Sequence, residues 1–230
     1  MVGKVLRGVA LIAGLLLLGY SICHRDLSNF RVCGGLTNGR PIVSLELARS
    51  PKEAQLIFGK DASTCDKDLI GHLNAANLAD EQVIIPLYGV LFAFFFFAAM
   101  EQSLRLPLLG VALTVVAVIC DYREDDYLAL ITGDHTHAQN WLVPLQWATD
   151  VKWMCLAFAS ALGGAMFSRR GGLYLIPAIV AMPFLPVTAA TLIDHDFIPA
   201  MNGLLVASFG ALWVMAAIAV VKPPQPPALA

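Results

Sequence analysis

Six stretches of the chain are long and apolar enough, or nearly so, to cross a membrane as helices. A hydrocarbon core about 30 Å thick needs about 20 mostly apolar residues in helical conformation. The stretches cover residues 5–22, 83–100, 104–120, 152–167, 173–193 and 197–221. We therefore predict an all-α membrane protein, a six-transmembrane-helix bundle.

The composition excludes several other classes of protein. The 230 residues are 58% hydrophobic and 14% charged, whereas a soluble domain carries about 25% charged residues. The mean hydropathy of +0.70 excludes a disordered tail as well, because disordered segments have low hydrophobicity. The net charge of −2 offers no basic surface to nucleic acid, so we expect no nucleic-acid partner.

The first apolar stretch has two interpretations. Lys4 and Arg7 precede a run of leucines, as in a secretory signal peptide, and Gly19-Tyr20-Ser21 offers small residues for cleavage. The apolar run is long for the core of a signal peptide, which favours an uncleaved transmembrane anchor over residues 1–22. Cleavage would instead leave five spans.

The distribution of lysine and arginine near the spans predicts the orientation. With the N-terminus inside, the inner side receives Lys4, Arg7, Arg105, Arg169, Arg170 and Lys222, with Glu101 as its only acid. A loop at 23–82, a loop at 121–151 and a turn at 194–196 then face outside, although the first loop carries seven lysines and arginines as a contrary signal. We expect a multi-pass protein of the cell inner (plasma) membrane with both termini cytoplasmic. Residues 83–221 would form a five-helix bundle and 222–230 a proline-rich cytoplasmic tail.

The loop at 23–82 shows signs of local order. Residues 42–47 read as a short extended run, whereas Ser50, Pro51 and Glu53 form the start of a short helix, because serine can cap, proline suits the first turn and glutamate completes a capping box. A second amphipathic stretch, 68–82, should run into the next span. We predict a small outer cap of short helices. A Cys33–Cys65 disulfide is plausible, but with Cys23 present the pairing stays open.

Three carboxylates follow the third apolar stretch at helical spacing. Asp121, Glu124 and Asp125 share one helix face, so the helix should continue to about Leu130. Carboxylates this close repel one another and need cations, water or a metal nearby. The simpler interpretation is a solvated helix end at the level of the lipid headgroups, with Arg123 and Lys152 as partial neutralisers. The alternative is a ligand-binding group.

Two histidine motifs are candidates for metal binding. His135 and His137 form a His-x-His pair, and His195 lies in an acidic turn between the last two spans. Imidazoles with a nearby carboxylate, such as Asp150, are ligands that zinc accepts. The predicted metal ligands are therefore His135, His137, His195 and Asp150, with a divalent metal as a possible cofactor. A polar loop and a polar hairpin are the simpler interpretations.

Two further residues are candidates for ligand binding. Glu46 lies in an apolar run, where burial would demand a partner. Asn202 lies one turn inside the sixth span, beside a fifth span that three prolines should kink. These features could line an outward-facing cavity. No ionisable residue is expected near the midpoint of any span, which argues against a coupled transporter.

Several of these pieces occur together. Ser44-Leu45-Glu46-Leu47-Ala48, a capped short helix, Asp121-x-x-Glu124 after a span and Lys152-Trp153 opening the next form the combination. It resembles a pattern in uncharacterised bacterial multi-pass membrane proteins and covers about a fifth of the chain. The resemblance implies a bacterial multi-pass protein and brings no known activity.

We therefore expect an integral membrane protein that binds a lipid, an amphiphile or a partner at its outer face. The predicted ligand-binding residues are Asp121, Glu124, Asp125, Asn202 and Glu46. The alternative is a metal-dependent membrane hydrolase that uses the outer-face Asp/Glu/His residues. A third possibility is an accessory subunit of a membrane complex. Membrane lipid is the expected partner, with other membrane proteins as further candidates.

Overall fold

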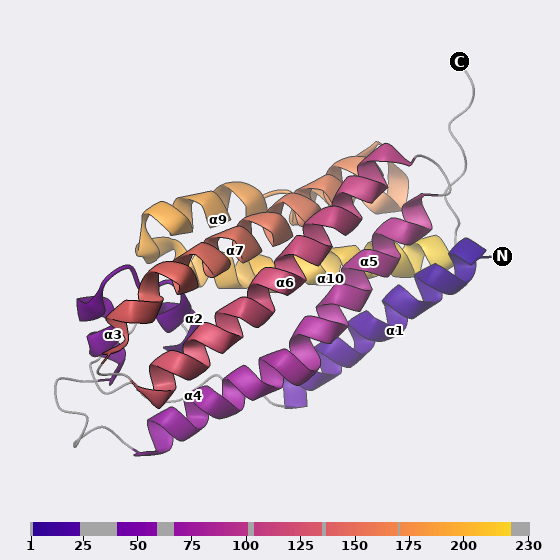
Figure 1. Cartoon of the computed structure of the whole chain (residues 1–230). Coiled ribbons are helices and arrows are strands. Elements are labelled where there is room, and N and C mark those ends of the chain that lie inside the picture. The colour runs from indigo at the N-terminus through magenta and orange to yellow at the C-terminus, as the bar shows by residue number, and fades with distance from the viewer. Residues whose placement is uncertain are drawn as a thin grey trace.

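The computed structural model describes residues 2–23, 41–58, 67–100, 104–134, 137–169 and 171–221. Every regular element in these ranges is a helix (Figure 1). The α-helices are α1 (Val2–Cys23), α2 (Pro41–Glu46), α3 (Pro51–Phe58), α4 (Lys67–Ala79), α5 (Ile85–Ala99), α6 (Arg105–Gly133), α7 (Gln139–Ser168), α8 (Leu175–Ala181), α9 (Phe184–Ile193) and α10 (Ile198–Val221). A π-helical turn, η2 (Asp80–Ile84), joins α4 to α5, and two 3₁₀ turns, η4 (Gly172–Tyr174) and η5 (His195–Phe197), precede α8 and α10.

Six helical segments are long and apolar enough to cross a membrane, which confirms the all-α multi-pass bundle. They are α1, the continuous segment Leu69–Ala99, α6, α7, the segment Gly172–Ile193 and α10. The first span begins and the last span ends at the same end of the bundle (Figure 1). The predicted boundary at 82/83 falls inside the continuous helix Leu69–Ala99, whereas the tail at 222–230 lies outside the described residues.

Two spans extend well beyond the apolar stretches. The third continues through its acidic residues to Gly133, as predicted, because Gly133 and Asp134 are the first residues that favour a stop. The fourth begins at Gln139 rather than near Lys152, since Leu142, Leu145 and Ala148 bury one face of this extra length. Lys152 therefore lies at the middle of α7. The uncharged part of α7, residues 153–168, begins directly after it, so Lys152 lies at one end of the apolar stretch although it is central in the helix.

The fifth span is broken near its centre. Helix α8 ends at Ala181, a turn covers Met182 and Pro183, and α9 starts at Phe184. Proline lacks an N–H group and its ring clashes with the carbonyl four residues earlier, so a helix breaks or kinks there. The predicted proline kink is confirmed.

Helices α2 and α3 pack on the end of the bundle opposite the first residue of α1 (Figure 1). Their apolar residues join the ends of α4, α6 and α7 in a second core, separate from the core of the bundle. Ser50 Oγ accepts a hydrogen bond from the Glu53 N–H at 3.3 Å, and Glu53 Oε2 accepts one from the Arg49 N–H at 2.7 Å. This is close to the capping box that the sequence predicts for α3.

The extended run predicted at 42–47 is a helix instead. Val43 and Leu47 are four residues apart and contribute to the bundle core. Leu45 and Ala48 are three residues apart and contribute to the second core. Helix α2 lies between two cores, so it carries apolar residues on two faces. In the sequence these residues resemble the alternating apolar pattern of a β-strand.

An ion pair ties this cap to α7. The Arg49 guanidinium donates to both carboxylate oxygens of Asp150, at 2.9 Å and 2.6 Å. Gln146, one turn earlier in α7, donates from Nε2 to the Ala48 carbonyl at 3.0 Å. Parallel hydrogen bonds between arginine and a carboxylate fix geometry as well as position. These contacts hold the end of α2 against α7 and so position Glu46.

Candidate binding site

Six ionisable side chains from four elements meet below the cap. Glu46 comes from α2, Asp80 from η2, Asp121, Glu124 and Asp125 from α6, and Lys152 from α7. We call this group the acid–lysine cluster. All of its members except Asp80, which is partly exposed, are at least nine-tenths buried.

Lys152 is the cation at the centre of the cluster. Its side chain is 4% exposed, and Nζ lies 2.7 Å from Glu124 Oε1, 3.0 Å from Asp121 Oδ1 and 3.4 Å from Glu46 Oε2. A buried ammonium is tolerated only when it is paired and hydrogen-bonded. These three carboxylates therefore fix Lys152 in place, and through it they join α2, α6 and α7.

Asp121 has a second partner in the membrane-spanning part of the bundle. The Tyr88 hydroxyl of α5 donates to Asp121 Oδ2 at 2.6 Å. Tyr88 is itself buried and its ring packs against Phe92 and Phe209. Asp121 is therefore held between a lysine on one oxygen and a tyrosine on the other.

The cluster has more acceptors than donors. Among the described residues the cluster has five carboxylates and one ammonium, which contacts three of them, and two enclosed carboxylate oxygens, Glu124 Oε2 and Asp125 Oδ2, have no hydrogen-bond partner there. The Asn77 side chain donates from Nδ2 to the backbone carbonyl of Asp125 at 3.1 Å, and not to its carboxylate. Buried acceptors without donors are unfavourable. Within the described part of the chain the cluster therefore carries excess negative charge, which protons or a bound cation would compensate.

The cluster lies near one boundary of the apolar slab. Residues 106–120 of α6 and 153–168 of α7 carry no charge. At 1.5 Å per residue, Asp121 and Lys152 each lie about 24 Å along the helix from the opposite end of its span. Since a hydrocarbon core is about 30 Å thick, these charges lie within reach of one interface. Protein rather than lipid surrounds them, as ionisable groups at this depth require.

A π-helical turn presents Asp80 to the cluster. The segment η2 interrupts an otherwise continuous helix, and the Ile85 N–H donates to the Asp80 carbonyl five residues back. Pro86 follows, and its ring excludes the carbonyl of Gln82 from the usual pairing, which gives a local reason for the wider turn. Single π turns inside α-helices are frequent at functional sites.

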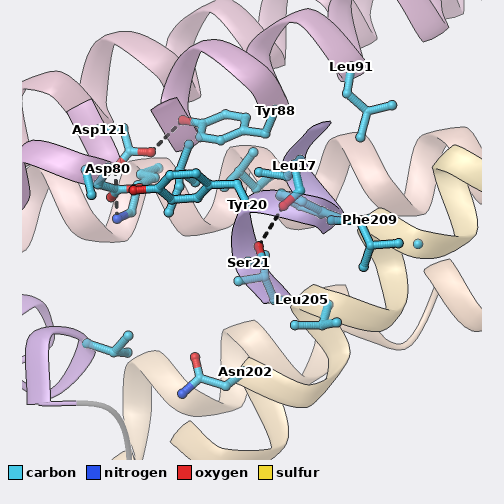
Figure 2. Close-up of a pocket in the computed structure, with 18 of the residues that line it drawn as sticks. Leu17, Tyr20, Ser21, Asp80, Tyr88, Leu91, Asp121, Asn202, Leu205 and Phe209 are labelled. Carbon is cyan, nitrogen blue, oxygen red and sulfur yellow. Dashed lines mark hydrogen bonds and ion pairs between the residues drawn. The ribbon is translucent and has the colours of Figure 1, made fainter. Parts of the chain in front are cut away.

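A cavity of about 310 Å³ opens beside the cluster. Figure 2 shows Asp80 and Asp121 close together at one end, with Tyr88 directed at Asp121 and with Leu91 and Phe209 toward the other end. Most of the wall is apolar, and α10 and α1 contribute more lining residues than any other helix. These two helices are joined where Trp213 Nε1 donates to the Leu11 carbonyl at 3.0 Å. The result is an apolar cavity with one acidic end.

The structure brings together most of the residues predicted to bind a ligand. Asp121, Glu124, Asp125 and Glu46 all belong to the acid–lysine cluster, and Asn202 lines the same cavity from α10 (Figure 2). The interpretation of the three acids as a solvated helix end does not fit their burial. Whether these residues bind a ligand stays a prediction.

Sequence reasoning missed Asp80 and Tyr88. In the sequence Asp80 belongs to the amphipathic stretch 68–82, yet it lies three residues before the second apolar stretch begins, as Asp121 lies just after the third one ends. Tyr88 carried no signal, because a tyrosine in an apolar helix is usually part of the core. Lys152 was expected only as a partial neutraliser.

The predicted metal ligands are placed differently. Asp150 is paired with Arg49, and His137 lies on the surface with Nδ1 2.8 Å from Asp134 Oδ2. His135 and the side chain of His195 lie outside the described residues, as do Cys33 and Cys65. The histidine metal site and the disulfide therefore stay predictions. Within the described ranges, the carboxylates of Asp80, Asp121 and Asp125 each bring one oxygen within 4.8 Å of the others.

Comparisons with protein-family models, with curated proteins and with solved structures found no match to this chain. The function is therefore inferred from the geometry of the cluster and its cavity.

Proposed function

We propose that this integral membrane protein binds a membrane amphiphile in the cavity, with a cationic head at the acid–lysine cluster and an apolar tail between α1 and α10. The observation that supports this most is the cavity itself, whose walls are apolar and whose acidic groups gather at one end. Binding pockets commonly combine apolar walls with a few convergent polar groups. The tail of an amphiphile would contact the apolar walls, and its polar head would lie at the acidic end.

The charge of the cluster favours a cationic or hydrogen-bond-donating head. Lys152 is already surrounded by Glu46, Asp121 and Glu124, so it offers little to an incoming phosphate or carboxylate. Carboxylates outnumber the ammonium among the described residues of the cluster, and of these carboxylates Asp80 lines the cavity and is partly exposed. An ammonium head would supply both donors and compensating charge.

The apolar part of the cavity offers a path from the bilayer. Leu18 of α1 and Val206 of α10 both line the cavity, and they are 47% and 60% exposed. In a membrane such exposed leucine and valine side chains face lipid. An amphiphile could therefore enter sideways between α1 and α10 without crossing water.

Binding can be measured with a series of single-chain probes that share one tail. Dodecylamine, dodecanol and dodecanoate are titrated against the protein in phosphatidylcholine nanodiscs, and bound probe is counted by native mass spectrometry. We expect the amine to bind at least about tenfold more tightly than the alcohol, since a charged hydrogen bond contributes about 1.5–3 kcal/mol. The carboxylate should bind most weakly.

Gly210 allows the cavity itself to be tested. It lines the cavity, and a Cβ there would meet nothing within 4 Å, so Gly210→Leu adds a bulky side chain at the cavity wall from an unobstructed Cβ position. We expect this change to weaken amine binding. Gly19→Leu is the matched control, because Gly19 is exposed, has equally open space and does not line the cavity. Equal binding of all three probes, or equal binding by both variants, would contradict the proposal.

The alternative of a metal-dependent membrane hydrolase stays a prediction, because two of its four predicted metal ligands, His135 and His195, have side chains outside the described residues. The accessory-subunit alternative also stays a prediction. It is tested by gentle solubilisation and size analysis, where a heteromer would support it and a stable single species would oppose it.

A further inference from the structure

We propose that Asp80, Asp121 and Asp125 form a binding site for one hard divalent cation at the acidic end of the cavity. One carboxylate oxygen from each residue lies within 4.8 Å of the other two. Oxygen ligands of a single Ca²⁺, each 2.3–2.6 Å from the ion, lie up to about 5 Å apart. The three oxygens are therefore close enough to share one ion. This site does not depend on the amphiphile.

An unsatisfied buried oxygen points to a ligand here independently of the clustering. Asp125 is 4% exposed, and its Oδ2 is enclosed without a hydrogen-bond partner among the residues that the structure describes. An acidic residue on a water-facing surface would be solvated, but Asp125 is buried, and Asn77 of α4 contacts only its backbone carbonyl. A buried carboxylate without a donor is costly, and a cation removes that cost.

The ligand chemistry selects the class of ion. The three ligands are carboxylate oxygens, which suit Ca²⁺, Mg²⁺ and Mn²⁺ better than the softer metals that prefer histidine or cysteine. Waters from the cavity would complete the coordination, as such ions usually require. The amine of Lys152 approaches Asp121 through Oδ1, while Glu46 and Glu124 balance its charge. The negative charge of five carboxylates exceeds the positive charge of Lys152, so a divalent ion would not make the cluster positive.

The ion has a route to the site. Asp80 and Asp121 line the cavity, and Asp80 is partly exposed, whereas Asp125 lies behind them. An ion entering the acidic end would therefore meet Asp80 first. Since the proposed cationic head would use the same two aspartates, the divalent ion and the amine should compete.

The site is tested with Mn²⁺ alone, in the absence of any amphiphilic amine. Full-length protein in detergent is titrated with Mn²⁺, and the bound ion is counted by electron paramagnetic resonance. We expect one bound Mn²⁺ per chain, competed by Ca²⁺ and accompanied by a rise in melting temperature. Asp125→Asn and Asp80→Asn should each weaken binding at least tenfold, as loss of a metal-binding partner commonly does.

Asp126→Asn is the matched control. Asp126 is the next residue on α6, and its substitution removes the same charge as Asp125→Asn. Its side chain, however, is 63% exposed and pairs with Arg123. We expect its Mn²⁺ affinity to equal that of the parent. Since Asp125→Asn keeps the shape of the side chain, gel filtration and the metal-free melting temperature show whether it has folded. No bound Mn²⁺ in the folded parent, or equal binding by Asp125→Asn and Asp126→Asn, would overturn the site. Neither result would bear on amine binding, which is measured separately.

Discussion

Replacing Lys152 with methionine is expected to destabilise the protein by about 3–5 kcal/mol. The methionine keeps most of the apolar stem but removes the ammonium, which leaves Glu46, Asp121 and Glu124 buried without their cation. Removing one partner of a buried ion pair is costly because the other charge stays behind. The loss is measured as the free energy of unfolding in mixed micelles titrated with denaturing detergent.

Two comparisons separate this mechanism from a general effect of losing a charge. Arg123→Met removes a cation from an exposed pair with Asp126, whose members are 68% and 63% exposed, and should cost less than about 1 kcal/mol. The double variant Lys152→Met, Glu124→Gln removes the ammonium together with one of its carboxylates. We expect it to be more stable than Lys152→Met alone, because the two changes are coupled. Equal stability of Lys152→Met and the parent would contradict the geometry of the cluster.

Replacing Gly164 with alanine is expected to destabilise the bundle by about 1–3 kcal/mol. A Cβ at this position of α7 would lie 2.7 Å from the Ala178 carbonyl oxygen of α8. The clash is with backbone, so no side-chain rotation can relieve it, and the two helices must separate. The same unfolding titration in micelles measures the loss.

Gly203→Ala is the control, with the opposite expected sign. Gly203 lies in α10, where a Cβ would meet nothing within 4 Å. Alanine inside a helix is favoured over glycine by about 0.5–1 kcal/mol, so this variant should be as stable as the parent or more stable. If Gly164→Ala matched Gly203→Ala, the close approach of α7 and α8 would be wrong.

The sequence predicts the bundle well because the physical signal is large. Apolar runs of about 20 residues indicate transmembrane helices. The fifth span breaks at Pro183, as expected for a proline inside a helix. The helical spacing of Asp121, Glu124 and Asp125 also predicts a shared face correctly. What the spacing cannot give is the environment of that face. A hydropathy pattern indicates that three neighbouring acids are exposed to solvent. Whether they are buried depends on which other helices pack against them.

The remaining parts of the site depend on contacts between distant segments. Glu46 reaches Lys152 because α2 is packed between two cores, which no local pattern reveals. Asp80 reaches Asp121 because a π turn interrupts a helix, and propensity scales do not predict such turns. The predicted fourth span begins only at Lys152, because polar residues precede it, yet two of those residues, Gln146 and Asp150, bind the cap. Each of these features becomes visible only once the tertiary packing is known.

Photolabelling tests most directly whether the cavity is the binding site. Protein in nanodiscs is irradiated with a long-chain alkylamine that carries a diazirine in its tail, and the labelled residues are mapped by peptide mass spectrometry. We predict labels on α1 and α10 at cavity residues such as Leu17 and Phe209, lost with excess dodecylamine and reduced in Gly210→Leu. Labels spread evenly over the lipid-facing residues, and unchanged by the competitor, would contradict the account.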